Sequence, residues 1–198
     1  MTTQASTQAA TLDEELEYIR RAGQGDPSAY EWLYQRHVKK IYSLVFRMVG
    51  NVIDAEEVTQ EVFLQAYRGL PMFQGRSRFY TWVFRIATNL SLQHLQKLSS
   101  RRDKTSIDEL LEKGRLPFFA TSGEDDPEKV VAGKEFLLQL ERALGQLTPN
   151  HRAVMTLGPI MGHSYEEVGE ILGLSAEVVK GRLHRARLRV RELIKQHR

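Results

Sequence analysis

The stretch "SYEEVGEILGLSAEVVKGRLHRAR", from Ser164 to Arg187, decides the fold of the C-terminal part of the chain. Ser164 and Glu167 have the spacing of a capping box, in which each side chain accepts a hydrogen bond from the other residue's backbone amide. Gly173 is suited to end the helix that this box begins, and Ser175 can cap a second helix, on which Val178, Val179 and Leu183 should pack back. Two short helices joined by a glycine turn are typical of a helix-turn-helix, whose second helix can enter the major groove of DNA.

The second of these helices carries an excess of positive charge. From Ala176 to Arg198 there are eight lysines or arginines against two acids, whereas the whole chain has a net charge of +3. Such a local excess indicates a polyanionic partner. A helical hairpin with a solvated basic face would carry the same charges, but the spacing of the caps and the turn favours DNA binding. Gly181 would let the helix backbone approach a ligand closely.

A second informative stretch, "FQGRSRFYTWVFRIATN", runs from Phe73 to Asn89. Five aromatic residues fall within twelve positions and three arginines accompany them, so the stretch combines core-forming and anion-binding side chains. We expect a loop over residues 73–78 and a helix that runs to about Leu98. Two faces of this helix should differ: Val83, Ile86 and Leu90 point into the core, while Arg85, Asn89, Gln93 and Lys97 form a polar, basic stripe.

The rest of the chain also predicts helices. Thr11 and Glu14 form a further capping box, Asp26 and Pro27 can begin a helix that Gly50 ends, and Asp54 is expected to cap a third helix. No run alternates apolar and polar residues as a strand would. We therefore expect an all-α protein of two small helical domains joined by a flexible linker. The expected parts are a disordered tail over 1–10, a first domain over 11–98, the linker over 99–129 and a second domain over 130–198.

Composition narrows the classes of function. The 198 residues are 41% hydrophobic and 27% charged, as in soluble globular proteins. The chain has no cysteine, which excludes disulfides, thiolate metal sites and cysteine nucleophiles. The six histidines lack metal-binding spacing, and those at positions 37 and 94 read as surface or capping residues. We expect no cofactor, no enzymatic activity, no membrane insertion and a cytoplasmic location.

Three motifs in sequence order resemble the extracytoplasmic-function (ECF) class of bacterial sigma factors. They are "DAEEVTQEVFLQAY" over 54–67, the aromatic stretch over 73–89, and "LTPNHRAVM" over 147–155 followed by the helix-turn-helix. The resemblance implies a protein that binds core RNA polymerase, directs it to promoters and helps to melt the DNA. It also implies that the first domain is sigma region 2, which binds the −10 element, and that the second is region 4, which binds the −35 element. Family members are commonly held inactive by an anti-sigma factor, often a membrane-bound one.

The resemblance implies three sets of contact residues. The β′ coiled coil of the polymerase would dock on the helix that carries Glu57, while region 4 would meet the β flap. Glu57 and Glu61 lie on one face of the helix over 54–67 and form an acidic stripe. This stripe would repel phosphate, so it suits a basic, partly apolar protein partner. The core polymerase contacts are Asp54, Glu57, Gln60, Glu61 and Leu64. The −10 contacts are Phe73, Gly75, Arg76, Ser77, Arg78, Tyr80, Trp82, Arg85, Asn89, Gln93 and Lys97, with Tyr80 and Trp82 as stacking surfaces. The −35 contacts are Ser164, Tyr165, Ser175, Glu177, Lys180, Gly181, Arg182, His184, Arg185 and Arg187.

One segment departs from the family pattern. Where relatives have a charged stretch before the helix-turn-helix, this chain has "LGPIMGHS" over 157–164. Pro159 lacks an amide hydrogen, so the helix from Pro149 should end or kink near Leu157. A weakened −35 interaction is the hypothesis that follows.

An autonomous regulator and an enzyme are the two alternatives to the sigma factor, which we expect to be a monomer when free. An autonomous regulator could bind DNA as a dimer through the helix-turn-helix, but the acidic stripe and the aromatic loop would have no role in it.

Trp82, expected above to stack on a base, could instead be an ordinary core residue.

Overall fold

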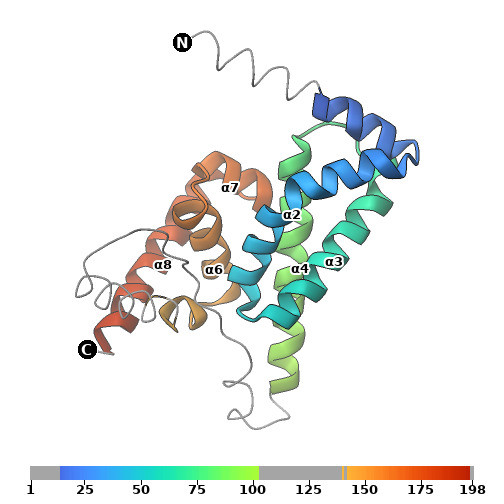
Figure 1. The fold of residues 1–198 in the computed structure, drawn as a ribbon. Coiled ribbons are helices and arrows are strands. Elements are labelled where there is room, and N and C mark those ends of the chain that lie inside the picture. The colour runs from blue at the N-terminus through green and yellow to red at the C-terminus, as the bar shows by residue number, and fades with distance from the viewer. Residues whose placement is uncertain (1–13, 103–139, 141, 197–198) are drawn as a thin grey trace, which may run out of the picture.

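The computed structural model describes residues 14–102, 140 and 142–196, and within these ranges all regular structure is helical. Residues 14–23 are helical and precede α2 (Pro27–Val49), α3 (Val52–Gly69), the short 3-10 helix η1 (Leu70–Met72) and α4 (Phe79–Arg102). The second group comprises α6 (Pro149–Met155), the π-helical turn η3 (Thr156–Ile160), α7 (Tyr165–Leu172) and α8 (Ala176–Gln196). Figure 1 shows the two groups as adjoining bundles. The all-α prediction is confirmed.

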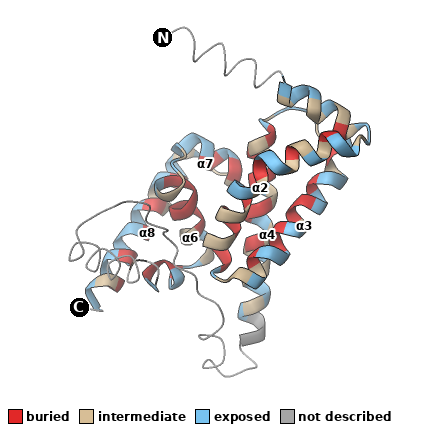
Figure 2. Cartoon of the chain, in the orientation of Figure 1, coloured by how far each residue is buried: buried red, intermediate tan, exposed pale blue. Residues whose placement is uncertain are grey.

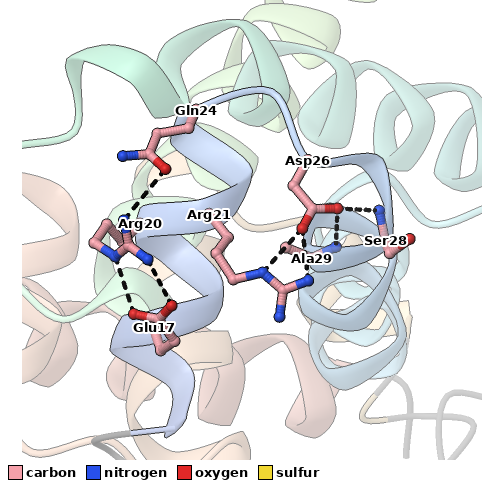
Figure 3. A network of polar contacts seen from close by, with 7 residues as sticks. All are labelled: Glu17, Arg20, Arg21, Gln24, Asp26, Ser28 and Ala29. Atoms are coloured by element: carbon pink, nitrogen blue, oxygen red, sulfur yellow. Dashed lines mark hydrogen bonds and ion pairs between the residues drawn. The ribbon is translucent and has the colours of Figure 1, made fainter.

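The start of α2 is fixed by one aspartate. The carboxylate of Asp26 accepts hydrogen bonds from the amides of Ser28 at 2.9 Å and Ala29 at 3.3 Å, and Pro27 follows it. The guanidinium of Arg21 lies 2.6 Å from the same carboxylate (Figure 3), so the cap also ties the preceding helix to α2. Arg21 and the two amides hold the pKa of Asp26 below its ordinary value. At its other end α2 stops at Gly50, whose φ of +87° favours glycine.

The first bundle buries one face of each of its three long helices (Figure 2). Apolar residues at helical spacing form the buried faces of α2 and α3. They are Leu33, Ile41, Leu44, Val45 and Met48 in α2, and Val58, Val62 and Ala66 in α3. The prediction for α4 is only partly right, because Val83 is buried whereas Ile86 and Leu90 are half-buried. Since α4 packs against α7 as well as α2 and α3, its buried face is rotated toward Phe84 and Ala87.

Two boundaries differ from those expected. The prediction that Asp54 caps α3 is wrong: Asn51 is the cap, and its side-chain oxygen accepts the amide of Asp54 at 2.8 Å. Both residue types can cap a helix, and the earlier cap lets the helix begin three residues, almost one turn, sooner. The fourth helix continues to Arg102, past the predicted end at Leu98. The predicted tail, the capping box at Thr11 and nearly all of the predicted linker lie outside the described residues.

The second bundle packs α6, α7 and α8 around a small core. Its buried side chains include Val154, Leu157, Val168, Ile171 and Leu183. Val179 is buried as predicted, but Val178 is 43% exposed, so the prediction that it packs back is wrong. The two residues are neighbours along α8, and adjacent positions on a helix point in directions about 100° apart.

The predicted irregularity at Pro159 is confirmed. Normal α-helical bonding ends at Met155, and the amide of Met161 instead donates to the carbonyl of Thr156 at 3.0 Å, five residues back. Pro159 has no amide hydrogen for the regular ladder, so the chain widens into a π-helical turn. Gly162, with a φ of +80°, then redirects the chain toward α7.

The two bundles contact one another directly. Helix α4 lies beside α7 (Figure 1), and η3 contacts α2. The buried apolar side chains of the two bundles form one continuous cluster. None of the described helices is long and apolar enough to span a bilayer.

Candidate functional site

The expected polymerase surface lies on the outer side of α3. Glu57 and Gln60 are exposed, Leu64 is 42% exposed, and Glu61 is half-buried and accepts a hydrogen bond from Gln65 at 3.1 Å. Ile53, 70% exposed, lies on the same side, because the positions 53, 57, 60 and 64 follow the helical repeat. We name this surface, Ile53, Glu57, Gln60, Glu61 and Leu64, the acidic face. Sequence reasoning missed Ile53, although its spacing of four residues from Glu57 could have revealed it.

Asp54, expected in the same set, has a different environment. Its carboxylate accepts a hydrogen bond from the side-chain amide of Asn51 at 2.5 Å and lies 3.0 Å from Nε2 of His94. The side chain is 23% exposed. These contacts join the start of α3 to α4, so Asp54 serves the fold of the bundle. The other histidine read as a surface or capping residue, His37, is buried and bonded to Glu15 at 2.7 Å.

The loop over 73–78 places its arginines outward. Gly75 has a φ of +67°, as the expected unusual backbone conformation requires, and Arg76 and Arg78 are exposed. Ser77 is half-buried. Phe73 turns inward, where its ring centroid lies 4.9 Å from that of Trp82.

Trp82 belongs to an aromatic cluster. Its ring centroid lies 5.7 Å from that of Phe79, and its indole lies against Gly69 at the end of α3. A Cβ at Gly69 would lie 3.0 Å from the indole, so the glycine makes room for the ring. Trp82 is half-buried, so most of the surface of its side chain packs in the core, as the alternative to a stacking role expects.

Tyr80 lies at the contact between the bundles. Its hydroxyl is 3.0 Å from Nε2 of His163, and its ring packs on Phe84 with centroids 4.0 Å apart. Lys40 lies over the ring at 5.6 Å. Burial raises the pKa of Tyr80 and lowers the pKa of His163, since both lose water around their charged forms. Sequence reasoning gave His163 no role, because its partner is 83 positions away.

The basic stripe on α4 is present as expected. Arg85, Asn89, Gln93 and Lys97 are all exposed along one side of the helix. The guanidinium of Arg85 also donates a hydrogen bond to the backbone carbonyl of Glu170 in α7. One member of the stripe is therefore already engaged by the second bundle.

The helix-turn-helix is built as its sequence predicted. Ser164 and Glu167 form the capping box, with amide-to-side-chain distances of 3.2 and 2.9 Å, and Gly173 has a φ of +67°. Ser175 accepts the amide of Val178 at 3.3 Å and begins α8. Gly169 was missed: a Cβ there would lie 2.5 Å from the carbonyl oxygen of Leu174, so only glycine permits this turn.

The outward side of α8 carries the expected DNA-binding residues. Glu177, Lys180, His184, Arg185 and Arg187 are exposed, and Gly181 and Arg182 are half-buried. Ser164, Tyr165 and Ser175 are also exposed, at the start of α7 and of α8. Nothing lies within 4 Å of a Cβ built at Gly181, so the helix surface there is open. Burial, together with the nearby Arg185 and Arg182, lowers the pKa of His151, as a concentration of positive charge would.

The site offers surfaces for macromolecules. Within the described ranges, no group of three histidine, aspartate or glutamate side chains is placed to hold a metal ion. The candidate residues instead form three exposed surfaces: the acidic face on α3, the basic stripe on α4 with the preceding loop, and the outward side of α8.

Comparison with known proteins identifies the family to which the chain belongs. The family model of sigma-70 region 2 matches residues 33–101, and that of sigma-70 region 4 matches residues 143–192. The chain is 32% identical over 179 residues to the ECF RNA polymerase sigma factor SigW of Bacillus subtilis, covering 89% of this chain and 95% of that one. It is 33% identical over 177 residues to the ECF RNA polymerase sigma factor SigE of Mycolicibacterium smegmatis, and there it covers 87% of its own length but spans only 65% of the relative.

A solved structure also shares the fold. The structure of CnrH in complex with the cytosolic domain of CnrY matches with a TM-score of 0.60 and 27% identity, over 90% of this chain and 96% of that one. Region 2 corresponds to the bundle of α2, α3 and α4, and region 4 to the bundle that holds the helix-turn-helix. The chain is a member of the ECF sigma factors of the sigma-70 family, non-enzymatic proteins that bind core RNA polymerase and promoter DNA to direct transcription initiation.

Proposed function

We propose that each of the three exposed surfaces of this sigma factor binds a different partner. The acidic face docks on the β′ coiled coil of core polymerase, the loop over 73–78 and the basic stripe capture the −10 element, and α8 reads the −35 element. The observation that carries this proposal is the separation of charge: acidic side chains gather on α3, whereas basic ones gather on α4 and α8. Phosphate would be repelled from the first and attracted to the others.

The chemistry of the acidic face favours a protein partner. Glu57 and Gln60 lie between two exposed apolar side chains, Ile53 and Leu64. A basic coiled coil with some apolar surface would complement both properties. Because the carboxylate of Asp54 is bonded within the bundle, we assign it a supporting position at the rim of this contact.

Strand capture is assigned to the loop and to α4. Arg76, Arg78 and the stripe provide donors for phosphates, and an opened base can stack on an aromatic ring, which is worth about 1–3 kcal/mol per base. Tyr80 and Trp82 are both assigned as stacking surfaces, and both are half-buried. Each ring also packs within the first bundle, since Tyr80 lies on Phe84 and Trp82 lies beside Phe73.

The −35 contact is assigned to Lys180, Gly181, His184 and Arg185 as base-reading positions, with Arg187 on phosphate. The π-helical turn at Pro159 precedes these helices, and we propose that it weakens the −35 interaction by changing their docking angle. Pro159→Glu would test this: if promoter affinity and its salt dependence stay unchanged, the idea is wrong.

Regulation by an anti-sigma factor is also proposed. CnrH, which shares the fold, has been solved with the cytosolic domain of CnrY, so a chain of this architecture can bind a protein partner of that kind. We infer a cytoplasmic monomer that is released from such a partner to serve a stress or envelope regulon.

Run-off transcription tests the function as a whole. Core polymerase with this chain should initiate at specific sites on genomic fragments, and core polymerase alone should not. Glu57→Lys should reduce binding to core polymerase, whereas Glu31→Lys, the same charge reversal at an exposed position of α2, should leave it unchanged. Equal binding by the two variants would remove the role assigned to the acidic face.

An autonomous dimeric regulator makes different predictions. It would protect palindromic sites without polymerase and would sediment as a dimer. Neither behaviour is expected here, since the acidic face would then have no partner.

A further inference from the structure

Val178 is an apolar side chain on the outward side of α8. It lies in the first turn of that helix and is 43% exposed, whereas its neighbour Val179 is buried. Val179 and Leu183 fill the core beneath this turn, so Val178 adds little to the packing of the bundle. The side-chain oxygen of Ser175 accepts the amide of Val178 at 3.3 Å, which fixes the valine at the start of the helix.

The valine shares one side of α8 with two arginines. Arg182 and Arg185 follow Val178 by four and seven residues, which is the helical repeat, and they are half-buried and exposed respectively. A single exposed apolar residue needs no explanation by itself. This one, however, begins a row that continues in guanidinium groups. A partner that matches the whole row must present hydrogen-bond acceptors and an apolar group together.

An opening in the helix surface lies beside the valine. Gly181 follows Val178 by three residues, and a Cβ built at this glycine would have no atom within 4 Å. Without a side chain at that position, a duplex can come close to the backbone of α8. The side chain of valine is short, so only such a close approach brings its methyl groups into contact with a base.

The major groove of DNA contains one apolar group that fits this row. Among the base edges, thymine presents its C5 methyl group, while guanine presents the O6 and N7 acceptors that pair with arginine. The first residues of a recognition helix are the ones that contact base edges. A protein partner would have to be both acidic and apolar to match the same row. DNA is favoured because Lys180 and Arg187, both exposed, continue the positive charge on the other flank of α8.

We propose that Val178 is a specificity-determining residue of the −35 contact, where its methyl groups meet the C5 methyl group of one thymine in the major groove. This inference rests on the proposed function of α8. It adds an apolar contact to base-reading positions that are otherwise polar, charged or without a side chain. Since phosphates are the same along the whole duplex, this contact contributes to sequence selection rather than to general affinity.

Replacement of thymine by deoxyuridine tests the contact. Deoxyuridine keeps the base pairing and the O4 acceptor, and it lacks only the C5 methyl group. The probe is a promoter fragment from which core polymerase with the full-length chain initiates in the run-off assay, and the thymines of its −35 element are replaced one at a time. At fixed salt, one replacement should weaken binding of the wild-type complex about fourfold, the factor that corresponds to one buried methyl group.

Val178→Ala should weaken binding to the thymine fragment by about the same factor and should remove the effect of deoxyuridine at that position. Alanine is the better helix former, so the variant should stay folded, which circular dichroism verifies. Leu188→Ala is the matched control, because Leu188 is also 43% exposed on α8. It lies about 15 Å further along the helix, beyond the major-groove width of about 12 Å. This variant should respond to deoxyuridine as the wild type does.

The outcomes separate the two proposals. If no replacement weakens binding by the wild-type complex, the thymine contact is wrong and the sigma function stands. Equal weakening of Val178→Ala on the thymine and deoxyuridine fragments would also overturn the contact and would assign the valine to a protein partner. If the chain gives no promoter-specific initiation on any genomic fragment, the proposed function fails and the thymine contact fails with it.

Discussion

Gly169 and Gly181 form a pair of glycines for which the structure predicts opposite responses to the same substitution. Both lie within helices, α7 and α8, where glycine is about 1 kcal/mol less favourable than alanine. An added Cβ at Gly181 has no atom within 4 Å, whereas one at Gly169 would lie 2.5 Å from the carbonyl oxygen of Leu174. Alanine should therefore stabilise one position and destabilise the other.

The size of the loss at Gly169 follows from what would have to move. The obstructing atom belongs to the backbone, so no side-chain rotation relieves it, and the turn is held by the Leu174 amide, which donates to the Gly169 carbonyl at 2.9 Å. Overpacking costs up to about 3 kcal/mol, against which the gain in helix propensity is about 1 kcal/mol. We expect a net loss of about 2 kcal/mol for Gly169→Ala and a gain of about 1 kcal/mol for Gly181→Ala.

Thermal unfolding monitored by circular dichroism measures both changes. For a chain of this length, about 1 kcal/mol corresponds to roughly 2–4 °C in Tm. Gly169→Ala should unfold about 4–8 °C lower than wild type, and Gly181→Ala about 2–4 °C higher. A Gly169→Ala protein whose Tm equals or exceeds the wild-type value would refute the idea that the turn requires glycine.

Two further predictions concern the core and the response to pH. Phe84→Ala should cost about 3–5 kcal/mol in denaturant unfolding, because it empties a fully buried position, while Ile53→Ala at a 70% exposed position should change stability by less than about 0.5 kcal/mol. Acidification should destabilise the folded chain: burial and Lys40 lower the pKa of His163 while Glu167 opposes them, so protonation favours the unfolded state as pH falls below the unfolded value of about 6.5. The Tm should then fall between about pH 7 and pH 5 by more in wild type than in His163→Ala, and an equal fall in the two proteins would contradict this assignment.

The helix ends were predictable because their determinants are local. The box of Ser164 and Glu167, the cap at Asp26 and the stop at Gly50 each involve residues within a few positions of one another. The same locality explains the error at Asp54, since Asn51, three positions earlier, could also cap and was overlooked. The exposed stripe on α4 was predictable from periodicity alone.

The contacts between the bundles could not be predicted from the hydrophobic periodicity of the sequence. Arg152 and Met48 are 104 positions apart, and Arg85 and Glu170 are 85 apart. Their acceptors are backbone carbonyls, which every residue possesses, so side-chain identity gives no signal. Trp82 shows a related limit: a half-buried aromatic residue beside a glycine on another helix can be read from sequence either as core or as a stacking surface.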